Sequence, residues 1–285
     1  MIVTVNYKIV EDIKFFLEAE KTDIETLSKK ANISKTLIYE ILKKGITTKQ
    51  NYERIYSYMY SLGYRINKVK EEFLKETSKT ILFHGSKYGL RQIQYDGSRK
   101  NCDFGEGFYL GETYDNAVCF VCENDNSSVY SFKLSSSKLN VVEFACSLEW
   151  MLAICYYRGT IKEYSDAKIV KQIIEKVENA DVIIAPIADN RMFYIMSLFA
   201  NGDINSEVAV HSLSASFMGK QIVLKTKKAL NSLKAIEKYY LCQQEKDSYI
   251  KFLSYRTNEI ETKLKMAKRE YKNGLYIEEL LKWEH

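Results

Sequence analysis

Apolar residues in the first seventy positions recur every three or four residues, the spacing that places them on one face of an α-helix. The residues that carry the pattern are Leu27, Ala31, Leu37, Ile38, Ile41 and Leu42. Thr22 or Asp23 can cap a first short helix, and Ser34 can cap a second that ends at Gly45. A third amphipathic helix is predicted over Gln50–Leu62, so this segment is expected to be all-α.

The pattern changes after Thr80, where short apolar runs typical of strands alternate with helical stretches. Strands are predicted at Ile81–Phe83, Ser128–Leu134, Ala180–Ala185 and Gln221–Lys225. Helices are predicted near Asp115–Val121, Glu143–Tyr157, Asp166–Val177 and Arg191–Ala200. Such a mixture favours an α+β unit over a regular parallel βαβ array.

Beyond Tyr239, apolar residues recur among alternating charges, which predicts further helices. These helices are expected to pack on the preceding unit or to form a homodimer contact. A cap over a cleft and a partner-binding surface are alternatives that no motif supports. The chain is therefore divided into an all-α unit over residues 1–72, an α+β unit over residues 79–239 and a helical extension over residues 240–285.

Composition is that of an ordinary folded protein, with 285 residues, 46% hydrophobic residues and a net charge of +5. We expect no transmembrane helix and no membrane partner, because no uncharged apolar run reaches about 18 residues. The start of the chain lacks a signal-peptide pattern, and six cysteines in mostly apolar surroundings indicate free thiols in a reducing cytoplasm. Cys119 and Cys122 have no second pair and no nearby histidine, so no metal site is expected.

The stretch Leu27–Leu42 resembles the helix-turn-helix of Cro/repressor-type regulators. Asn32 replaces the usual turn glycine and tolerates a left-handed backbone better than other non-glycine residues. Residues 21–70 hold eleven basic and four acidic side chains, a local net charge of +7 that exceeds the +5 of the whole chain. The resemblance implies major-groove DNA binding, with a module that only packs or dimerises as the alternative. The implied DNA contacts are Lys35, Thr36 and Tyr39 near bases, and Lys43, Lys44 and Lys49 near phosphates.

Two glycine-containing motifs stand out in the α+β unit. His84, Gly85 and Ser86 close an apolar run, and Gly105-Glu106-Gly107-Phe108-Tyr109 follows about twenty residues later. Together they resemble the NAD-binding half of the His-Tyr-Glu class of ADP-ribosyltransferases, the diphtheria-toxin and poly(ADP-ribose)-polymerase type. That resemblance implies a split β-sheet over roughly residues 81–226 and NAD as the substrate.

The resemblance also implies roles for individual residues. His84 and Ser86 are expected to hydrogen-bond ribose hydroxyls, while Gly85 lets the backbone reach the nicotinamide amide. Tyr109 would line the nicotinamide pocket, and Phe120 stands where the class has a stacking tyrosine, although either could be a plain core aromatic. The remaining residues expected to contact NAD are Gly107 in the second motif, Phe104 directly before that motif, and Arg99 and Arg191 on the pyrophosphate.

A closer resemblance is to an uncharacterised bacterial family assigned to the ADP-ribosyltransferase superfamily. It shares the segments Ser98–Tyr109 and Ala180–Met192. The class has a catalytic glutamate at the start of a late strand, where this chain has Gln221, which lacks the charge that stabilises a cationic ribose. Asp189, or less readily Glu106 or Asp103, could supply the carboxylate, although Asp189 could instead cap a helix.

Three functions follow from these patterns. The first is a bacterial mono-ADP-ribosyltransferase with a fused DNA reader, as in a toxin–antitoxin or phage-defence effector, with an unknown protein or nucleic-acid acceptor. Its catalytic residues would be His84, Tyr109, Gln221 and Asp189. The second is a non-catalytic regulator that senses NAD or a related nucleotide, which Gln221 favours. The third is an interaction protein with an inactive pocket.

Overall fold

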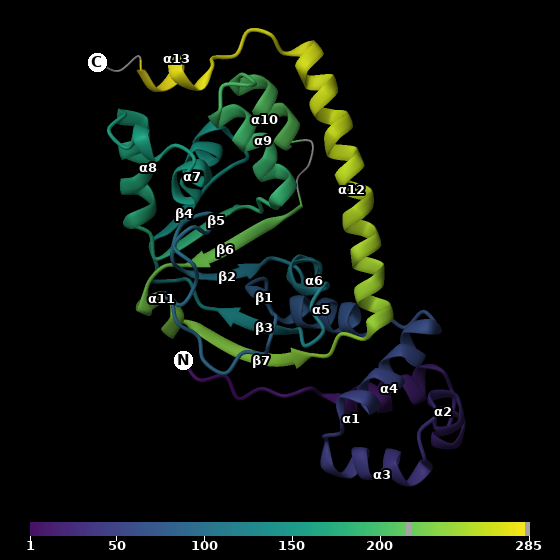
Figure 1. Ribbon diagram of the computed structural model, residues 1–285. Coiled ribbons are helices and arrows are strands. Elements are labelled where there is room, and N and C mark those ends of the chain that lie inside the picture. The colour runs from purple at the N-terminus through teal and green to yellow at the C-terminus, as the bar shows by residue number, and fades with distance from the viewer. Residues whose placement is uncertain (215–217, 283–285) are drawn as a thin grey trace.

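The computed structural model describes residues 1–214 and 218–282, shown as a ribbon in Figure 1. Five helices form an N-terminal unit, a seven-stranded sheet lies in the middle, and helices follow it at the C-terminus. The predicted α+β class is therefore confirmed. None of the helices within those ranges is both long and apolar enough to cross a bilayer.

The N-terminal helices bury one face each around a shared core. Ile13, Phe16, Ile38 and Ile55 are each fully buried there. Because all four are large and apolar, their burial contributes roughly 1.5–3 kcal/mol apiece to holding the unit together. The helices are α1 Ile9–Ala19, α2 Ile24–Ala31, α3 Lys35–Lys44, α4 Lys49–Ser61 and α5 Ile66–Thr77.

The turn between α2 and α3 has the geometry that its sequence predicts. Asp23 caps α2 and Ser34 caps α3 through side-chain oxygens that accept backbone N–H groups. Asn32 has a φ of 54°, and Gly45 ends α3 with a φ of 71°, both in the left-handed region. These capping and turn predictions are confirmed, and α3 lies at the end of the molecule away from the sheet (Figure 1).

The sheet has the strand order β4-β5-β6-β2-β1-β3-β7, with β4 and β5 parallel and the other neighbours antiparallel. Its two halves, β4-β5-β6-β2 and β1-β3-β7, are joined at β1 and β2 by one registered residue pair, Phe83 with Gly111. The sheet is therefore nearly split in two. The strands are β1 Ile81–Ser86, β2 Phe108–Gly111, β3 Ser128–Leu134, β4 Val141–Glu143, β5 Val182–Pro186, β6 Lys220–Leu224 and β7 Leu233–Tyr239.

Helices cover one face of both halves. On the β1-β3-β7 half, α6 packs on Phe83, Val129 and Tyr239. On the other half, the helices that follow β4 and β5 bury Ile183 and Val223. The opposite face is covered by α11, by the first residues of the chain and by the segment after β1. The central helices are α6 Tyr114–Val121, α7 Leu148–Arg158, α8 Lys168–Glu178, α9 Asn190–Ala200, α10 Ser206–Ser214 and α11 Lys227–Asn231, with a 3-10 turn at Lys162–Tyr164.

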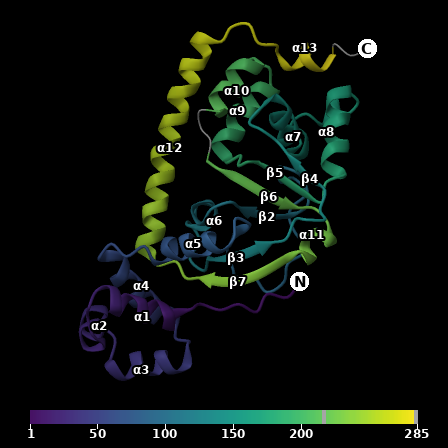
Figure 2. The same cartoon turned by 180° about the vertical axis from the view of Figure 1, so that it is seen from behind.

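The C-terminal extension is helical, as its periodicity predicts. It contains α12 Gln243–Glu270 and α13 Ile277–Lys282. Figures 1 and 2 show α12 running along one side of the molecule, from the N-terminal helices past α6 and α9 to α10. This helix therefore spans both halves of the sheet and the N-terminal unit.

Helix α5 continues past the predicted boundary at residue 72 and is part of the packing between units. Lys70 lies between two buried carboxylates, with its Nζ 2.8 Å from Asp12 of α1 and 2.5 Å from Glu237 of β7. Burial raises the pKa of Asp12, while the charge of Lys70 acts in the opposite direction. Since each charge needs its partner, this network ties the N-terminal unit to the sheet.

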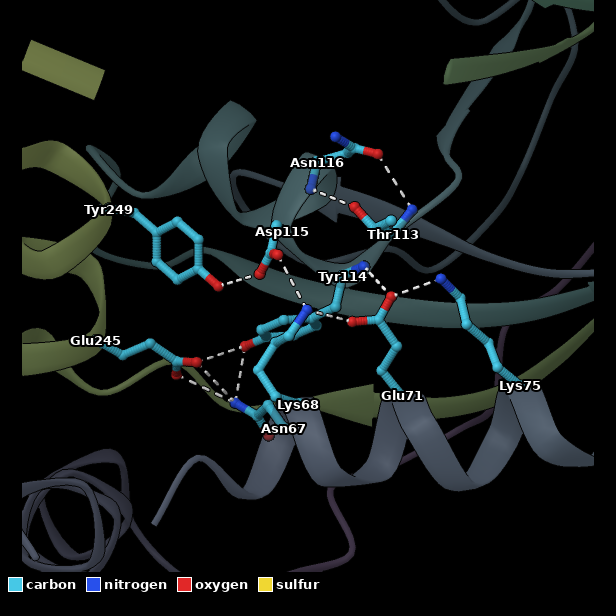
Figure 3. Close-up of polar contacts among 10 residues, drawn as sticks. All are labelled: Asn67, Lys68, Glu71, Lys75, Thr113, Tyr114, Asp115, Asn116, Glu245 and Tyr249. Carbon is cyan, nitrogen blue, oxygen red and sulfur yellow. Dashed lines mark hydrogen bonds and ion pairs between the residues drawn. The ribbon is translucent and has the colours of Figure 1, made fainter. Parts of the chain in front are cut away.

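A second buried network joins α5, α6 and α12 (Figure 3). The carboxylate of Glu71 accepts the Tyr114 backbone N–H at 2.9 Å, at the first turn of α6. The Tyr114 hydroxyl donates to Glu245 of α12 at 3.0 Å, and the Asn67 amide donates to the same carboxylate at 3.1 Å. Lys68 forms ion pairs with Glu71 at 2.6 Å and with Asp115 at 2.9 Å. The start of α6 is therefore fixed from two sides.

The four-residue β2 and the three-residue β4 are not predicted from the pattern, and neither is β7, which has seven residues. β2 begins directly after a glycine-rich loop, and β4 has only three residues. The predicted helix over Glu143–Tyr157 begins five residues later, at Leu148, because Ser147 caps it with its side-chain oxygen. Hydrophobic periodicity and strand propensity are weak signals in segments as short as β2 and β4.

Burial raises the pKa of Glu245 to about 7, above the value of 4.5 for an unperturbed glutamate. The folded state therefore keeps a proton that the unfolded chain releases between about pH 4.5 and pH 7, so stability falls as pH rises through that window. We predict that Glu245→Gln is about 2 kcal/mol more stable than wild type at pH 8, with a smaller gain at pH 5. Urea unfolding at both pH values measures this difference.

Glu261→Gln, an exposed change on the same helix, is the control and should show no such pH-dependent gain. An equal gain for Glu245→Gln at both pH values would contradict the buried titration.

Candidate functional site

The backbone of Gly85 faces the place where β1 and β2 separate. The Thr80 carbonyl accepts from the Leu134 N–H at 3.0 Å, which continues the β1–β3 ladder. Backbone N–H and C=O groups alternate in direction along a strand. The N–H and C=O groups of Leu82, His84 and Ser86 therefore point to β3, and those of Gly85 point to β2. The pair Phe83–Gly111 is the single registered pair between β1 and β2. The Gly85 N–H and C=O therefore point beyond this pair, to the place where β1 and β2 have no registered pairing, which is called the opening below.

The His84 imidazole spans the two motifs. Its Nδ1 lies 2.7 Å from the Tyr109 carbonyl oxygen, which can only accept, so Nδ1 carries the proton and Nε2 has a free lone pair. The ring is half-buried and lies 4.5 Å from the Phe108 ring. Burial lowers the pKa of His84, while the bond to Tyr109 acts in the opposite direction. The imidazole is therefore a neutral hydrogen-bond acceptor at neutral pH.

Glycine at position 85 is required by helix packing as well as by access to the opening. A Cβ there would lie 2.3 Å from the Ala117 carbonyl oxygen of α6, which no side chain can tolerate. A Cβ at Gly107 would lie 2.5 Å from Val223, and one at Gly111 would lie 2.6 Å from Asn116. Gly85 of the first motif, Gly107 of the second and Gly111 at the end of β2 thus let α6 and β6 approach β1 and β2 closely.

The loop before β2 is held by buried polar contacts. The Tyr109 hydroxyl accepts from the Phe104 N–H at 3.1 Å and donates to the Gly105 carbonyl at 2.7 Å. Burial, with a smaller contribution from the charge of Asp103, raises the pKa of this hydroxyl. The Lys225 Nζ donates to the Phe104 carbonyl at 2.6 Å. Tyr109 therefore anchors the loop, and its ring lies on the opposite face of the sheet from the His84 ring, although its carbonyl binds that imidazole.

Gln221 lies in a buried cluster with Asp103 and Arg158. It is 7% exposed, and its Nε2 donates to Asp103 Oδ2 at 2.7 Å and to the Pro186 carbonyl at 3.0 Å. Arg158 donates to the other carboxylate oxygen of Asp103 through Nε at 2.8 Å and Nη2 at 2.5 Å. Both neighbours of the Gln221 amide nitrogen are acceptors, so this position requires a donor that a glutamate could not provide.

Asp189 caps α9, which is the structural alternative considered for it. Its Oδ1 accepts the backbone N–H of Arg191 at 3.0 Å and that of Met192 at 2.9 Å. Its Oδ2 accepts from the Arg191 guanidinium, which also donates to the Leu253 carbonyl of α12. Asp189 and Arg191 therefore join α9 to α12.

The remaining predicted NAD contacts differ in accessibility. Phe120 is 66% exposed on α6, and Lys87 Nζ lies 5.9 Å from the centroid of its ring. Arg99 is exposed, whereas Phe104 is fully buried against Phe144 and offers no surface to a ligand. The Ser86 hydroxyl donates to the Gly89 carbonyl at 2.8 Å and shapes the loop after β1.

The predicted DNA contacts lie together on the outer face of α3. Lys35, Thr36, Tyr39, Lys43 and Lys44 are all exposed. Lys35 is paired with Glu25 at 2.8 Å, an ion pair that a phosphate would have to replace. Lys49, at the start of α4, instead donates to the Asp125 carbonyl at 3.0 Å, which ties it to the sheet unit.

Sequence reasoning missed the roles of Arg158 and Lys225. Arg158 is the last residue of α7, a position where a cation is common for the helix dipole alone. Lys225 follows β6 directly and has no motif around it. Their partners lie 55 and 121 positions earlier in the chain, so no local signal identifies either.

We predict that Gln221→Glu lowers the free energy of unfolding by roughly 3 kcal/mol at pH 8, because it buries a second carboxylate against Asp103. The pair can share a proton only at lower pH, so the loss should shrink toward pH 5. Denaturant unfolding at both pH values measures it. The double variant Gln221→Glu/Asp103→Asn, which restores a donor, should recover part of the stability. A Gln221→Glu protein as stable as wild type at pH 8 would show that the amide is not required.

Comparison with known proteins gives a family without an assigned activity. No curated protein and no solved structure matches the chain. Residues 80–235, from the start of β1 into β7 and more than half of the chain, match the family described as "Protein of unknown function (DUF3990)". The chain therefore belongs to the DUF3990 family.

Proposed function

We propose that this protein is an NAD-dependent mono-ADP-ribosyltransferase whose N-terminal unit binds DNA. The observation that carries the proposal is the hydrogen bond between His84 Nδ1 and the Tyr109 carbonyl. It joins the two motifs at the opening between β1 and β2, and it leaves the imidazole Nε2 as an acceptor beside the Gly85 backbone. An acceptor and a free peptide edge side by side suit a ribose hydroxyl and a carboxamide.

The reaction would break the bond between the nicotinamide nitrogen and the ribose C1′. The electron pair leaves with nicotinamide, and an acceptor nucleophile forms the new bond to C1′ and loses its proton. His84 would orient the ribose by accepting a hydrogen bond from a ribose hydroxyl at Nε2, and the Gly85 N–H and C=O would bind the amide. Phe120 would offer an aromatic face to the pyridinium ring.

Charge stabilisation is where this site departs from the parent class. Gln221 is occupied with Asp103 and Pro186, so its amide would not reach a ribose without breaking two buried hydrogen bonds. Asp103 is the carboxylate that Gln221 contacts, and the guanidinium of Arg158 offsets the charge of Asp103. We therefore infer slow turnover, with binding and orientation by His84 and Gly85 as the main contribution to catalysis. The acceptor, protein or nucleic acid, would belong to a toxin or phage-defence setting.

The second candidate function is a regulator that binds NAD or a related nucleotide without cleaving it. The donor role of Gln221 favours this reading, since the catalytic carboxylate of the parent class is replaced by a structural amide. The DNA-binding unit suits either function. It is joined to the site through α5 and the start of α6, so a ligand that moves α6 would strain the contacts of the N-terminal helices.

We predict that purified protein releases nicotinamide from labelled NAD and transfers label to a component of a cell lysate. His84→Ala should lower the rate about tenfold or more, because it removes an oriented hydrogen bond in the site. His211→Ala is the matched control, since that ring stacks on Tyr271 at 3.7 Å, and it should retain the wild-type rate. Saturable NAD binding without turnover would favour the regulator, and absence of binding would contradict both functions.

For the N-terminal unit we predict salt-sensitive binding of the full chain to duplex DNA. Lys43→Ala/Lys44→Ala should reduce the slope of log affinity against log salt by about two, because two phosphate contacts release fewer counterions. Fluorescence anisotropy between about 50 and 200 mM salt measures the slope. Lys133→Ala/Lys138→Ala removes the same charge from the exposed surface of the sheet unit and should leave the slope unchanged. Identical slopes for both double variants would remove α3 from the DNA interface.

A further inference from the structure

A cavity of about 300 Å³ lies between the N-terminal helices and the sheet, and no motif points to it. Its lining comes from five separate segments: the start of the chain, the turn into α4, the loop after β1, the loop before β3 and the end of β7. The residues used below are Tyr7, Lys49, Tyr52, Tyr88, Lys238 and Tyr240. A cavity of this size is at the lower end of the range for small-molecule sites and suits a single nucleotide unit.

Three tyrosines form a wall that is already ordered. The Tyr52 and Tyr240 rings stack at 5.2 Å, and the Tyr7 ring meets Tyr52 edge-on at 4.9 Å. Their positions are held by hydroxyl contacts, of Tyr7 with Ser128 at 3.0 Å and of Tyr240 with Glu53 at 3.0 Å. A fourth ring, Tyr88, also lines the cavity and is 85% exposed. Because Tyr52 and Tyr240 are each 6% exposed and stack on one another, Tyr88 is the ring in this lining whose face a planar group can reach.

Two cations line the same cavity without a carboxylate partner. Lys238 Nζ lies 4.5 Å from the centroid of the Tyr7 ring, and it forms no ion pair within the described ranges 1–214 and 218–282. Lys49 Nζ binds two neutral oxygens, the Asp125 carbonyl and Asn126 Oδ1, each at 3.0 Å. Asp125 is the one acidic residue in the lining, so the cavity has a net positive charge. A ligand with an aromatic ring and an anionic group complements these features.

The cavity is separate from the opening beside Gly85. That opening lies on the β2 side of β1, whereas the cavity lies on the β3 and β7 side. His84 pairs with Tyr130 of β3, and Tyr130 pairs with Lys238 of β7, which places His84 and Lys238 two strands, or about 10 Å, apart. The loop after β1 connects the two places, since Ser86 binds Gly89 and Gly89 lines the cavity.

We propose that this cavity binds a nucleoside monophosphate unit, with its base against the exposed Tyr88 ring and its phosphate beside Lys238 and Lys49. Such a ligand would contact the turn into α4 and the strands β3 and β7 at once, and would hold the DNA-binding helices against the sheet. A free nucleotide and the 5′-phosphorylated end of a nucleic-acid strand share this chemistry. The proposal is independent of NAD cleavage at His84.

Isothermal calorimetry on the full chain tests it with AMP, adenosine and a short 5′-phosphorylated single-stranded oligonucleotide. AMP should bind saturably and about tenfold more tightly than adenosine, because the phosphate contributes charge-assisted contacts. Lys238→Gln and Tyr88→Ala should each weaken AMP binding about tenfold, with thermal midpoints near that of wild type. Lys234→Gln, exposed on the same strand, is the matched control and should bind AMP as wild type does.

His84→Ala should bind AMP with unchanged affinity, which separates this cavity from the proposed NAD site. Tighter binding of the oligonucleotide than of AMP would support the proposal and identify a strand end as the ligand. Loss of AMP binding in His84→Ala with retention in Lys238→Gln would overturn it. So would equal affinity for adenosine and AMP, or no binding of either AMP or the oligonucleotide.

Discussion

The hydrogen bond from the His84 imidazole to the Tyr109 carbonyl is the constraint on which the candidate site depends. Beyond the pair Phe83–Gly111, the two halves of the sheet have no further registered pairing, so β1 and β2 would be free to move apart or close together. A side chain of β1 bonded to the main chain of β2 sets their separation instead. The same hydrogen bond also selects the imidazole tautomer with the proton on Nδ1. One contact therefore sets both the separation of β1 and β2 and the acceptor at Nε2.

Helix α6 holds that arrangement from behind. It lies directly against Gly85, and its first turn is bound by Glu71 of α5 and, through Tyr114, by Glu245 of α12. A buried network of this kind has few alternative arrangements, because each donor or charge that loses its partner costs roughly 1–3 kcal/mol. The N-terminal helices, the extension α12 and the backbone of the first motif are thus linked by direct contacts, through which the proposed DNA or nucleotide binding would act on the opening.

Local chemistry predicted much of the fold. The caps Asp23, Ser34 and the left-handed Asn32 were accessible because a helix end depends on neighbours within a few positions. The role of Gln221 was not accessible, since it depends on Asp103, 118 positions earlier in the chain, and on the Pro186 carbonyl. From the sequence alone, Gln221 is interpreted as an uncharged replacement for a glutamate. The structure shows that its neighbours require an amide donor at this position. Asp189 is the opposite case. Its position as a helix cap could be predicted from neighbouring residues, and only its connection to α12 through Arg191 required the structure.

The central claim is that a neutral, Nδ1-protonated His84 presents Nε2 to NAD. The chain has three histidines, so ¹⁵N NMR of the imidazoles, assigned with His84→Ala, observes this atom directly. The account predicts that His84 is the Nδ1–H tautomer at pH 7 and that its Nε2 resonance shifts on titration with NAD, while His211 is unaffected. An Nε2–H tautomer, or an Nε2 resonance that does not respond to saturating NAD, would contradict it.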